Sequence, residues 1–345
     1  MNIRDVYSEV KKRIDKVDFN SLWPGFKKLR FAIYNEKEAC FDGDLIDKHA
    51  EFIANTAILY KEEEIGIWNL TEETDCDVLS SKLIHEMFHG FQCLNNESRF
   101  PDEFEAIIKY KYIDENLSIK LIENKIISSL AMKFDTIEYQ KLLLLRKYRS
   151  DKYPYEYDYE VRIEEIEGTA NYVEFESLKQ INYEKYSKKF AQSLKDISNK
   201  DYFIPIRIIS YDIGALLFKV IIENHINVDL SFSNILTMKK ILKGTESIKQ
   251  EVALEFRDDI NQYFVETDEI IKKALKENEV VFFGSEELAG FNVYNARYLD
   301  GYLVSNYFIA YGKGDAKTLL YGDFVAKTDG KNISKIYKTE LDYWK

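Results

Sequence analysis

The chain has 345 residues, enough for one large domain or two to three smaller ones with a sizeable buried core. Its composition, 46% hydrophobic and 31% charged, is typical of a soluble globular protein. The net charge of −12 is spread over a mixture of acidic and basic residues along the whole chain, which argues against nucleic acid as a partner because phosphate binding needs a concentrated Lys/Arg surface.

The first ten residues lack the apolar core of a signal peptide, and no apolar run reaches the length of about 18 residues that a spanning helix needs. We therefore expect no membrane association. The three cysteines, Cys40, Cys76 and Cys93, have no CxxC spacing, which predicts reduced thiols and a cytoplasmic location. Cys93 is expected to be a small packing residue. The oligomeric state is not predicted by the sequence.

Residues 1–70 are predicted to combine a helix with a small β part. Apolar residues at helical spacing predict a leading helix over residues 3–18. Short β-type runs follow at 29–34, 52–60 and 65–70, and residues 61–64 form a hairpin turn between the last two. Polar residues 71–77 supply N-cap candidates for a helix that runs to about Leu94 and ends at Asn95-Asn96.

Residues 71–278 are predicted to be mainly helical and residues 279–345 to form a small antiparallel β appendage, so the predicted fold class is α+β. Residues 102–150 are expected to be entirely helical, and the Tyr-rich segment 151–159 to be a break. Further helices are expected at 158–180, 184–197, 206–224, 233–242 and 247–278. Strands are expected at 280–283, 291–298, 302–311, 318–326 and 333–338.

The stretch His85-Glu86-Met87-Phe88-His89 is the most informative part of the sequence. Residues four apart on a helix share one face, with Cβ atoms about 5–6 Å apart. Two imidazoles at this spacing can bind one zinc ion, and Glu86 beside them can accept a proton from water. The chain has only 4 histidines, so finding two of them in this pattern favours a zinc site over a chance match.

A catalytic zinc site needs a third protein ligand and leaves its fourth position to water or substrate. Asn95 occupies the position of the third histidine used by one zincin branch, and His49 and His225 have no motif around them. These two are interpreted as surface or satisfied core histidines, so a carboxylate is expected as third ligand. The candidates are polar residues that share one face, or stripe, of a predicted helix: Glu160, Glu164, Glu167, Asn171 and Glu174. The alternative interpretation is that this face is an acidic surface exposed to solvent.

Within this stripe, the segment Glu167-Gly168-Thr169-Ala170-Asn171-Tyr172-Val173-Glu174 resembles the NEGxAxYxE segment of the gluzincin metallopeptidases, especially the zinc aminopeptidase branch. The resemblance implies a zincin-like domain with one Zn²⁺ per chain, ligands His85, His89 and Glu167, and Glu86 as general base. It also implies that Glu174, with Asn171 beside it, supports the site by orienting a ligand imidazole. The Gly168 position would allow two helices to approach closely.

A second segment, Ser210-Tyr211-Asp212-Ile213-Gly214-Ala215, resembles the Tyr-x-x-Gly-Ala segment of the same family. The resemblance implies that Tyr211 stabilises the oxyanion formed during amide hydrolysis. Together the similarities cover roughly residues 50–225. They depart from the aminopeptidase branch twice: helices 102–150 are inserted before Glu167, and Asn69 replaces the Glu of the Gly-x-Met-Glu-Asn motif that binds a free amino terminus.

The sequence therefore predicts zinc-dependent hydrolysis of a peptide or protein substrate, with cleavage inside the chain and at its end both left open. The substrate is expected to lie along the 65–70 strand, at Gly66, Trp68 and Asn69. One alternative is a non-catalytic binding or regulatory protein whose zinc ion joins two helices, with Cys93 or Glu164 as a fourth ligand. Another is a zinc hydrolase of a non-peptide amide or ester.

Overall fold

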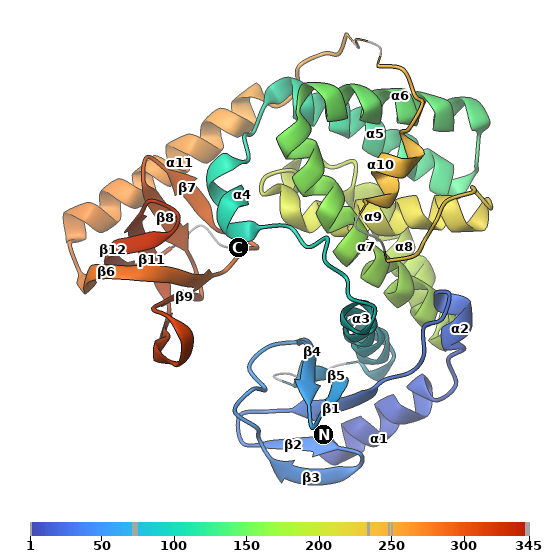
Figure 1. Cartoon of the computed structure of the whole chain (residues 1–345), viewed down its shortest axis with the longest axis horizontal. Coiled ribbons are helices and arrows are strands. Elements are labelled where there is room, and N and C mark those ends of the chain that lie inside the picture. Colours follow the sequence, from blue (N-terminus) through green and yellow to red (C-terminus); the bar gives the residue numbers. More distant parts are fainter. Residues whose placement is uncertain (1, 71–74, 233–234, 248, 250, 342–345) are drawn as a thin grey trace.

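A computed structural model describes residues 2–70, 75–232, 235–247, 249 and 251–341. It has an α+β fold, as predicted, with a small mixed sheet near the N-terminus, a helical middle and an antiparallel sheet at the C-terminus (Figure 1). Helix α3 (Cys76–Leu94) lies between the N-terminal sheet and helix α7 (Pro154–Ile181) in Figure 1. Among the described residues, no helix combines the length and the apolar character that a membrane span requires.

The N-terminal part contains a five-stranded sheet among the described residues, in the order β3-β2-β1-β5-β4. Its strands are β1 (Arg30–Tyr34), β2 (Glu38–Phe41), β3 (Asp44–Asp47), β4 (Thr56–Tyr60) and β5 (Glu63–Asn69). Strands β1 and β5 pair in parallel, and the other pairs are antiparallel. The prediction missed β2 and β3, although Asp42-Gly43 between them, with both φ angles positive, is a typical hairpin turn.

Helix α1 (Ile3–Ile14) is four residues shorter than predicted, and the short helix α2 (Phe19–Leu22) follows it. Helix α3 begins and ends where its capping residues require. The Asp75 carboxylate accepts hydrogen bonds from the first-turn backbone, and Asn95 caps the C-terminus before Asn96 takes a positive φ of 56°. Some of the N-cap candidates predicted for this helix, residues 71–74, lie outside the described part of the chain.

The helical middle follows much of the predicted pattern, but residues 110–113 and 133–135, which were predicted to be helical, connect helices. Its helices are α4 (Glu103–Lys109), α5 (Asp114–Met132), α6 (Thr136–Lys152), α7 (Pro154–Ile181), α8 (Tyr183–Asp196), α9 (Ile206–Glu223), α10 (Thr237–Ile241) and α11 (Arg257–Glu277). The predicted break at 151–159 is wrong, because Tyr153 alone separates α6 from α7 and Pro154 begins α7, where its missing N–H costs no hydrogen bond. Helix α11 starts ten residues later than predicted. Helix α10 is also shorter than the predicted helix 233–242.

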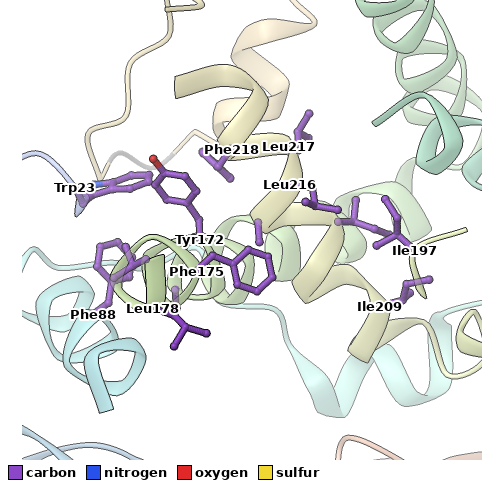
Figure 2. Close-up of a cluster of buried hydrophobic side chains, with 14 of the residues drawn as sticks. Trp23, Phe88, Tyr172, Phe175, Leu178, Ile197, Ile209, Leu216, Leu217 and Phe218 are labelled. Atoms are coloured by element: carbon purple, nitrogen blue, oxygen red, sulfur yellow. The ribbon is translucent and has the colours of Figure 1, made fainter. Parts of the chain in front are cut away.

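A buried aromatic cluster holds α3, α7 and α9 together (Figure 2). The Trp23 ring is its hub, with ring centroids 5.4 Å from Phe88, 6.3 Å from Tyr172 and 5.8 Å from Phe218. Each partner comes from a different helix, so burial of this one indole couples the positions of all three helices.

The C-terminal part is a fully antiparallel sheet with the order β10-β9-β6-β12-β11-β8-β7. Its strands are β6 (Val280–Phe291), β7 (Arg297–Leu299), β8 (Tyr302–Ser305), β9 (Phe308–Tyr311), β10 (Thr318–Tyr321), β11 (Asp323–Thr328) and β12 (Asn332–Thr339). Helix α11 packs on one face through Ile270, Ile271 and Ala274, and Ile107 of α4 packs against the other. The predicted strand 291–298 is wrong over 292–296, which form a loop. The predicted strand 302–311 is two strands: β8 pairs with β7 and β11, and β9 pairs with β6 and β10.

Candidate metal centre

Helices α3 and α7 bring three potential metal ligands together. The Nε2 atoms of His85 and His89 lie 3.0 Å apart. The Glu167 Oε2 atom lies 3.3 Å from Nε2 of His89 and 3.9 Å from Nε2 of His85. Ligand atoms at zinc-binding distance in a tetrahedral arrangement are about 3.3–3.5 Å apart. All three atoms lie within 4.8 Å of one another, as binding to one metal ion requires.

Neighbouring side chains orient both imidazoles toward this point. The Gln92 amide nitrogen donates to the Ile166 carbonyl oxygen (2.9 Å), so the Gln92 oxygen faces Nδ1 of His89 at 2.8 Å. That oxygen can only accept, so Nδ1 of His89 carries the proton and Nε2 keeps its lone pair for a metal. The Glu174 carboxylate lies 3.4 Å from Nδ1 of His85 and would act on that ring in the same way.

The charges at the centre favour a bound cation. Burial tends to raise the pKa of Glu167, but the imidazole of His89 and the Arg207 guanidinium outweigh it and lower that pKa to about 2. Burial tends to lower the pKa of His89, but the Glu167 carboxylate raises it to about 9. The site thus stabilises positive charge between these side chains. In the absence of a metal the proton on His89 supplies this charge, and a divalent cation bound to the neutral imidazole could replace that proton.

Glu86 lies in the same centre without a partner of its own. It is buried, and burial raises its pKa above the ordinary value for a glutamate. Within the described ranges, no hydrogen bond or ion pair joins its carboxylate to another residue, in contrast to Glu167 and Glu174. A carboxylate in this state is free to accept a proton from a group that enters the site.

Helix α9 adds Tyr211 and an arginine to the centre. One guanidinium nitrogen of Arg207, Nη2, donates to Oε1 of Glu167 and to the phenol oxygen of Tyr211, at 3.1 Å each. The other terminal nitrogen pairs with Glu103. Because the Tyr211 oxygen accepts from Arg207, its own O–H can donate elsewhere, and burial raises the Tyr211 pKa so that the proton is retained.

A contact between two glycines sets the distance between α7 and α9. A Cβ atom on Gly168 would lie 2.5 Å from the Gly214 Cα, and one on Gly214 would lie 2.2 Å from the Glu164 carbonyl oxygen. Both distances are far below van der Waals contact, so only glycine fits at either position. The predicted close helix approach at Gly168 is confirmed, and it brings Glu167 next to the helix that carries Tyr211.

Three predicted substrate-binding residues lie on β5, and one expectation about them is wrong. Gly66 lies inside the sheet, because β5 pairs with β1 on one side and with β4 on the other, so no peptide can add along its backbone there. The edge strand next to β5 is β4. Trp68 and Asn69 lie beyond the end of β4, and the Asn69 N–H donates to the side chain of Asn55 (2.7 Å).

Other predicted residues lie outside the ligand group. Asn171 donates weakly to Asp212 (3.4 Å) rather than to either histidine, and His49 and His225 are exposed, as the surface interpretation predicts. The three thiols are free, as expected. Cys93, however, is exposed and not a buried packing residue, because Gln92, one position earlier, faces α7.

Several residues of the centre were not predicted from the sequence. Arg207 precedes Tyr211 by four positions and Gln92 follows His89 by three, so helical spacing could have identified both. Glu103, Lys189 and Tyr294 lie on other elements, and no local pattern marks them. Lys189 pairs with Glu174, and the Tyr294 ring lies 6.5 Å from that of Tyr211.

Comparison with known proteins gives no family for this chain: no protein-family model, curated protein or solved structure matches it.

Proposed function

We propose that this chain is a zinc-dependent peptidase of the gluzincin type, with a zincin-like catalytic part. In this proposal His85, His89 and Glu167 hold the zinc ion, Glu86 is the general base and Tyr211 stabilises the oxyanion. The observation that carries the proposal is the convergence of three partly buried ligand residues next to the buried carboxylate of Glu86, which has no partner within the described ranges. A structural zinc site does not need such a carboxylate, whereas a hydrolytic site does.

The chemistry divides between the metal and the side chains around it. Bound zinc would supply Lewis acidity toward the peptide carbonyl group and toward water. Glu86 would accept the proton of the attacking water and pass it to the leaving amine, for which its raised pKa is suited. The Tyr211 O–H would donate to the carbonyl oxygen as negative charge develops there, and Arg207 would hold the phenol in place.

The edge strand β4 is the better candidate for binding an extended substrate. Its outer edge has no neighbouring strand among the described residues, and it lies beside α3, where a Cβ on Gly90 would be 3.6 Å from the Ala57 Cβ. A peptide could add to β4 through backbone hydrogen bonds and extend past Trp68 and Asn69. Asn69 carries no charge to bind a free amino terminus, so this residue does not favour cleavage at the end of a chain.

The alternative of a purely structural zinc site has less support. It needs a fourth protein ligand. Of the two candidates, Glu164 is paired with Lys120 and Arg146, and Cys93 is exposed outside the ligand group. A hydrolase of a non-peptide amide or ester would use the same residues, so substrate assays must distinguish it from a peptidase.

Metal content and turnover together test this proposal. Wild type and Glu86→Gln are expected to contain one zinc ion per chain by mass spectrometry, and Glu167→Ala to lose it. On a library of quenched fluorescent peptides, Glu86→Gln should lower turnover by about 10²–10⁴-fold. The control for Glu167→Ala is Glu176→Ala, also on α7. It removes a carboxylate paired with Lys179 and should keep zinc and activity. Full activity in Glu86→Gln, or undiminished zinc in Glu167→Ala, would overturn the assignment.

A further inference from the structure

A cavity of about 410 Å³ separates the helical part from the C-terminal sheet. It is bounded by α4, the segment after it, the start of α9, α11, and the end of β6 with the loop that follows. Its volume falls in the range of small-molecule sites, about 300–1,000 Å³. The lining residues that matter here are Glu103, Tyr112, Arg207, Phe264, Phe291 and Val293.

The walls of this cavity are mostly aromatic and aliphatic. Tyr112 comes from the segment after α4, Phe264 from α11, and Phe291 and Val293 from the C-terminal sheet and its loop. Phe264 is 37% exposed although it lies in this apolar lining. An apolar group that enters would remove such surface from water, which favours binding by roughly 25 cal/mol per Å².

The cavity shares one wall with the candidate metal centre. Arg207 lines it while its Nη2 atom contacts both Glu167 and Tyr211. The Arg207 side chain is buried, and its Nε has no hydrogen-bond partner within the described ranges. Tyr294 follows Val293 of the cavity wall, and its ring lies against the Arg207 guanidinium (5.8 Å). A substrate held at the metal would therefore have this cavity beside it.

The charges at the inner end favour an uncharged occupant. Arg207 is already paired with Glu103 and Glu167, so an anionic group would face two carboxylates that share one cation. A cationic side chain would face the guanidinium itself. The unpartnered Nε of Arg207 suits a neutral acceptor, such as a substrate carbonyl oxygen.

We propose that this cavity binds one large uncharged side chain of the substrate, aromatic or branched aliphatic, and that the C-terminal sheet serves as part of the substrate-binding site. This inference rests on the proposed peptidase function and adds a substrate preference to it. It assigns a role to the C-terminal sheet, whose loop residue Tyr294 also lies against Arg207.

The test fills the cavity and measures side-chain preference. Quenched peptides would carry a single Phe or Ala at each position around the cleaved bond. Wild type is expected to cleave the best Phe peptide about 10–100-fold faster in kcat/KM than its Ala counterpart, from burial of one aromatic side chain. Val293→Trp should reduce this ratio to near one. Val281→Trp, the same change at an exposed position of β6, should leave the ratio unchanged.

Phe264→Lys is a second variant, which places a charge on the partly exposed wall and should also abolish the preference. Direct binding of N-acetylphenylalaninamide to the zinc-loaded protein, followed by NMR, separates the two proposals. Peptide cleavage with no preference, or with one that both variants retain, overturns the cavity proposal and leaves the peptidase standing. Binding that Val293→Trp abolishes, without cleavage of any peptide, supports the cavity and overturns the peptidase. Absence of both overturns both.

Discussion

The two halves of helix α7 carry similar acidic residues and use them differently. Glu160 and Glu164 in the first half, and Glu167 and Glu174 in the second, are all buried or nearly so. In the first half each carboxylate is paired with basic side chains. In the second half the two carboxylates also face imidazoles.

The first half is a closed ion network contributed by the inserted helices. Lys120 of α5 lies 2.8 Å from Glu160 and 3.1 Å from Glu164. Arg149 and Arg146 of α6 pair with the same two carboxylates. Burial tends to raise the pKa of Glu160, but Arg149 and Lys120 lower it to about 2. Both Glu160 and Glu164 thus have basic partners within the protein. We therefore infer that these carboxylates stabilise the fold.

The second half lacks such compensation. Lys189 and Arg207 are its cations, and Arg207 is shared with Glu103. When the imidazoles are neutral, as metal binding requires, the three carboxylates Glu86, Glu167 and Glu174 exceed the positive charge of these two side chains. Acidic residues on one helix stripe thus form a candidate metal site or a structural ion network, depending on the cations that neighbouring helices supply.

The largest expected effect is a difference in stability between substitutions in the two halves of α7. Glu160→Gln should lower the free energy of unfolding by about 3–5 kcal/mol, because Lys120 and Arg149 would keep buried charges without their partner. Glu167→Gln should cost the metal-free protein less, about 1–2 kcal/mol, because Arg207 keeps Glu103 and His89 can release its proton. Urea unfolding with a chelator present measures both. Equal losses would mean that Glu167 is a structural residue like Glu160.

The next effect concerns catalysis in the second half. Tyr211→Phe removes the proposed donor to the oxyanion and should lower kcat by about 10²–10³-fold while zinc content stays unchanged. Tyr321→Phe, at a residue that is 76% exposed, is the matched control and should have no effect. Loss of zinc from Tyr211→Phe would instead show that the phenol supports the ligands.

A smaller effect is expected at the junction between the halves. Gly168→Ala would force α7 and α9 apart and should cost about 1–3 kcal/mol of stability, together with weaker zinc binding. Gly284→Ala is the control, since its new Cβ would meet only the end of the Phe282 ring, and it should change stability by less than about 0.5 kcal/mol. Unchanged zinc affinity in Gly168→Ala would show that the glycine contact does not position Glu167.

The smallest effect concerns the anchoring of the C-terminus of α7. Asp77 of α3 accepts a hydrogen bond from Asn182, the residue that ends α7, and pairs with Lys185 (2.6 Å). Burial tends to raise the Asp77 pKa, but Lys185 and Arg13 outweigh it and lower that pKa from 3.8 to about 2.

Because the folded pKa is depressed, this stabilisation is complete above the unfolded pKa and disappears as the pH falls toward 2. Asp77→Asn should therefore cost about 1–2 kcal/mol at pH 7, and the difference from wild type should vanish near pH 2. Thermal unfolding across this pH range measures the effect. A pH-independent difference would mean that the carboxylate charge contributes nothing.

Much of the fold could be predicted from the sequence because its long helices have strong apolar periodicity. Helix α9 and strand β1 agree with their predicted ranges to within a residue. The errors lie at short elements and their connections. The β2 and β3 strands are four residues each, too short for a clear alternation, and the break before α7 was misjudged because Pro154 starts a helix as readily as it ends one.

The candidate site was also predicted best where its residues lie close together in the sequence. The HExxH spacing, the Glu-Gly segment and the Tyr-x-x-Gly-Ala segment are local patterns, because a helix places residues three, four and seven apart on one face whatever lies around it. The sequence by itself therefore determined which side chains could bind a metal, and it predicted the α+β class.

Only the tertiary structure decided which of these side chains meet. Gln92 reaches a carbonyl oxygen 74 residues further along the chain, and Arg207 joins Glu167 across 40 residues. The same packing paired Glu160 and Glu164 with cations, closed both edges of β5 at Gly66 and brought the C-terminal sheet beside Arg207. These outcomes depend on contacts between helices and sheets that no local spacing encodes, because helical periodicity determines which face a side chain occupies and not what covers that face.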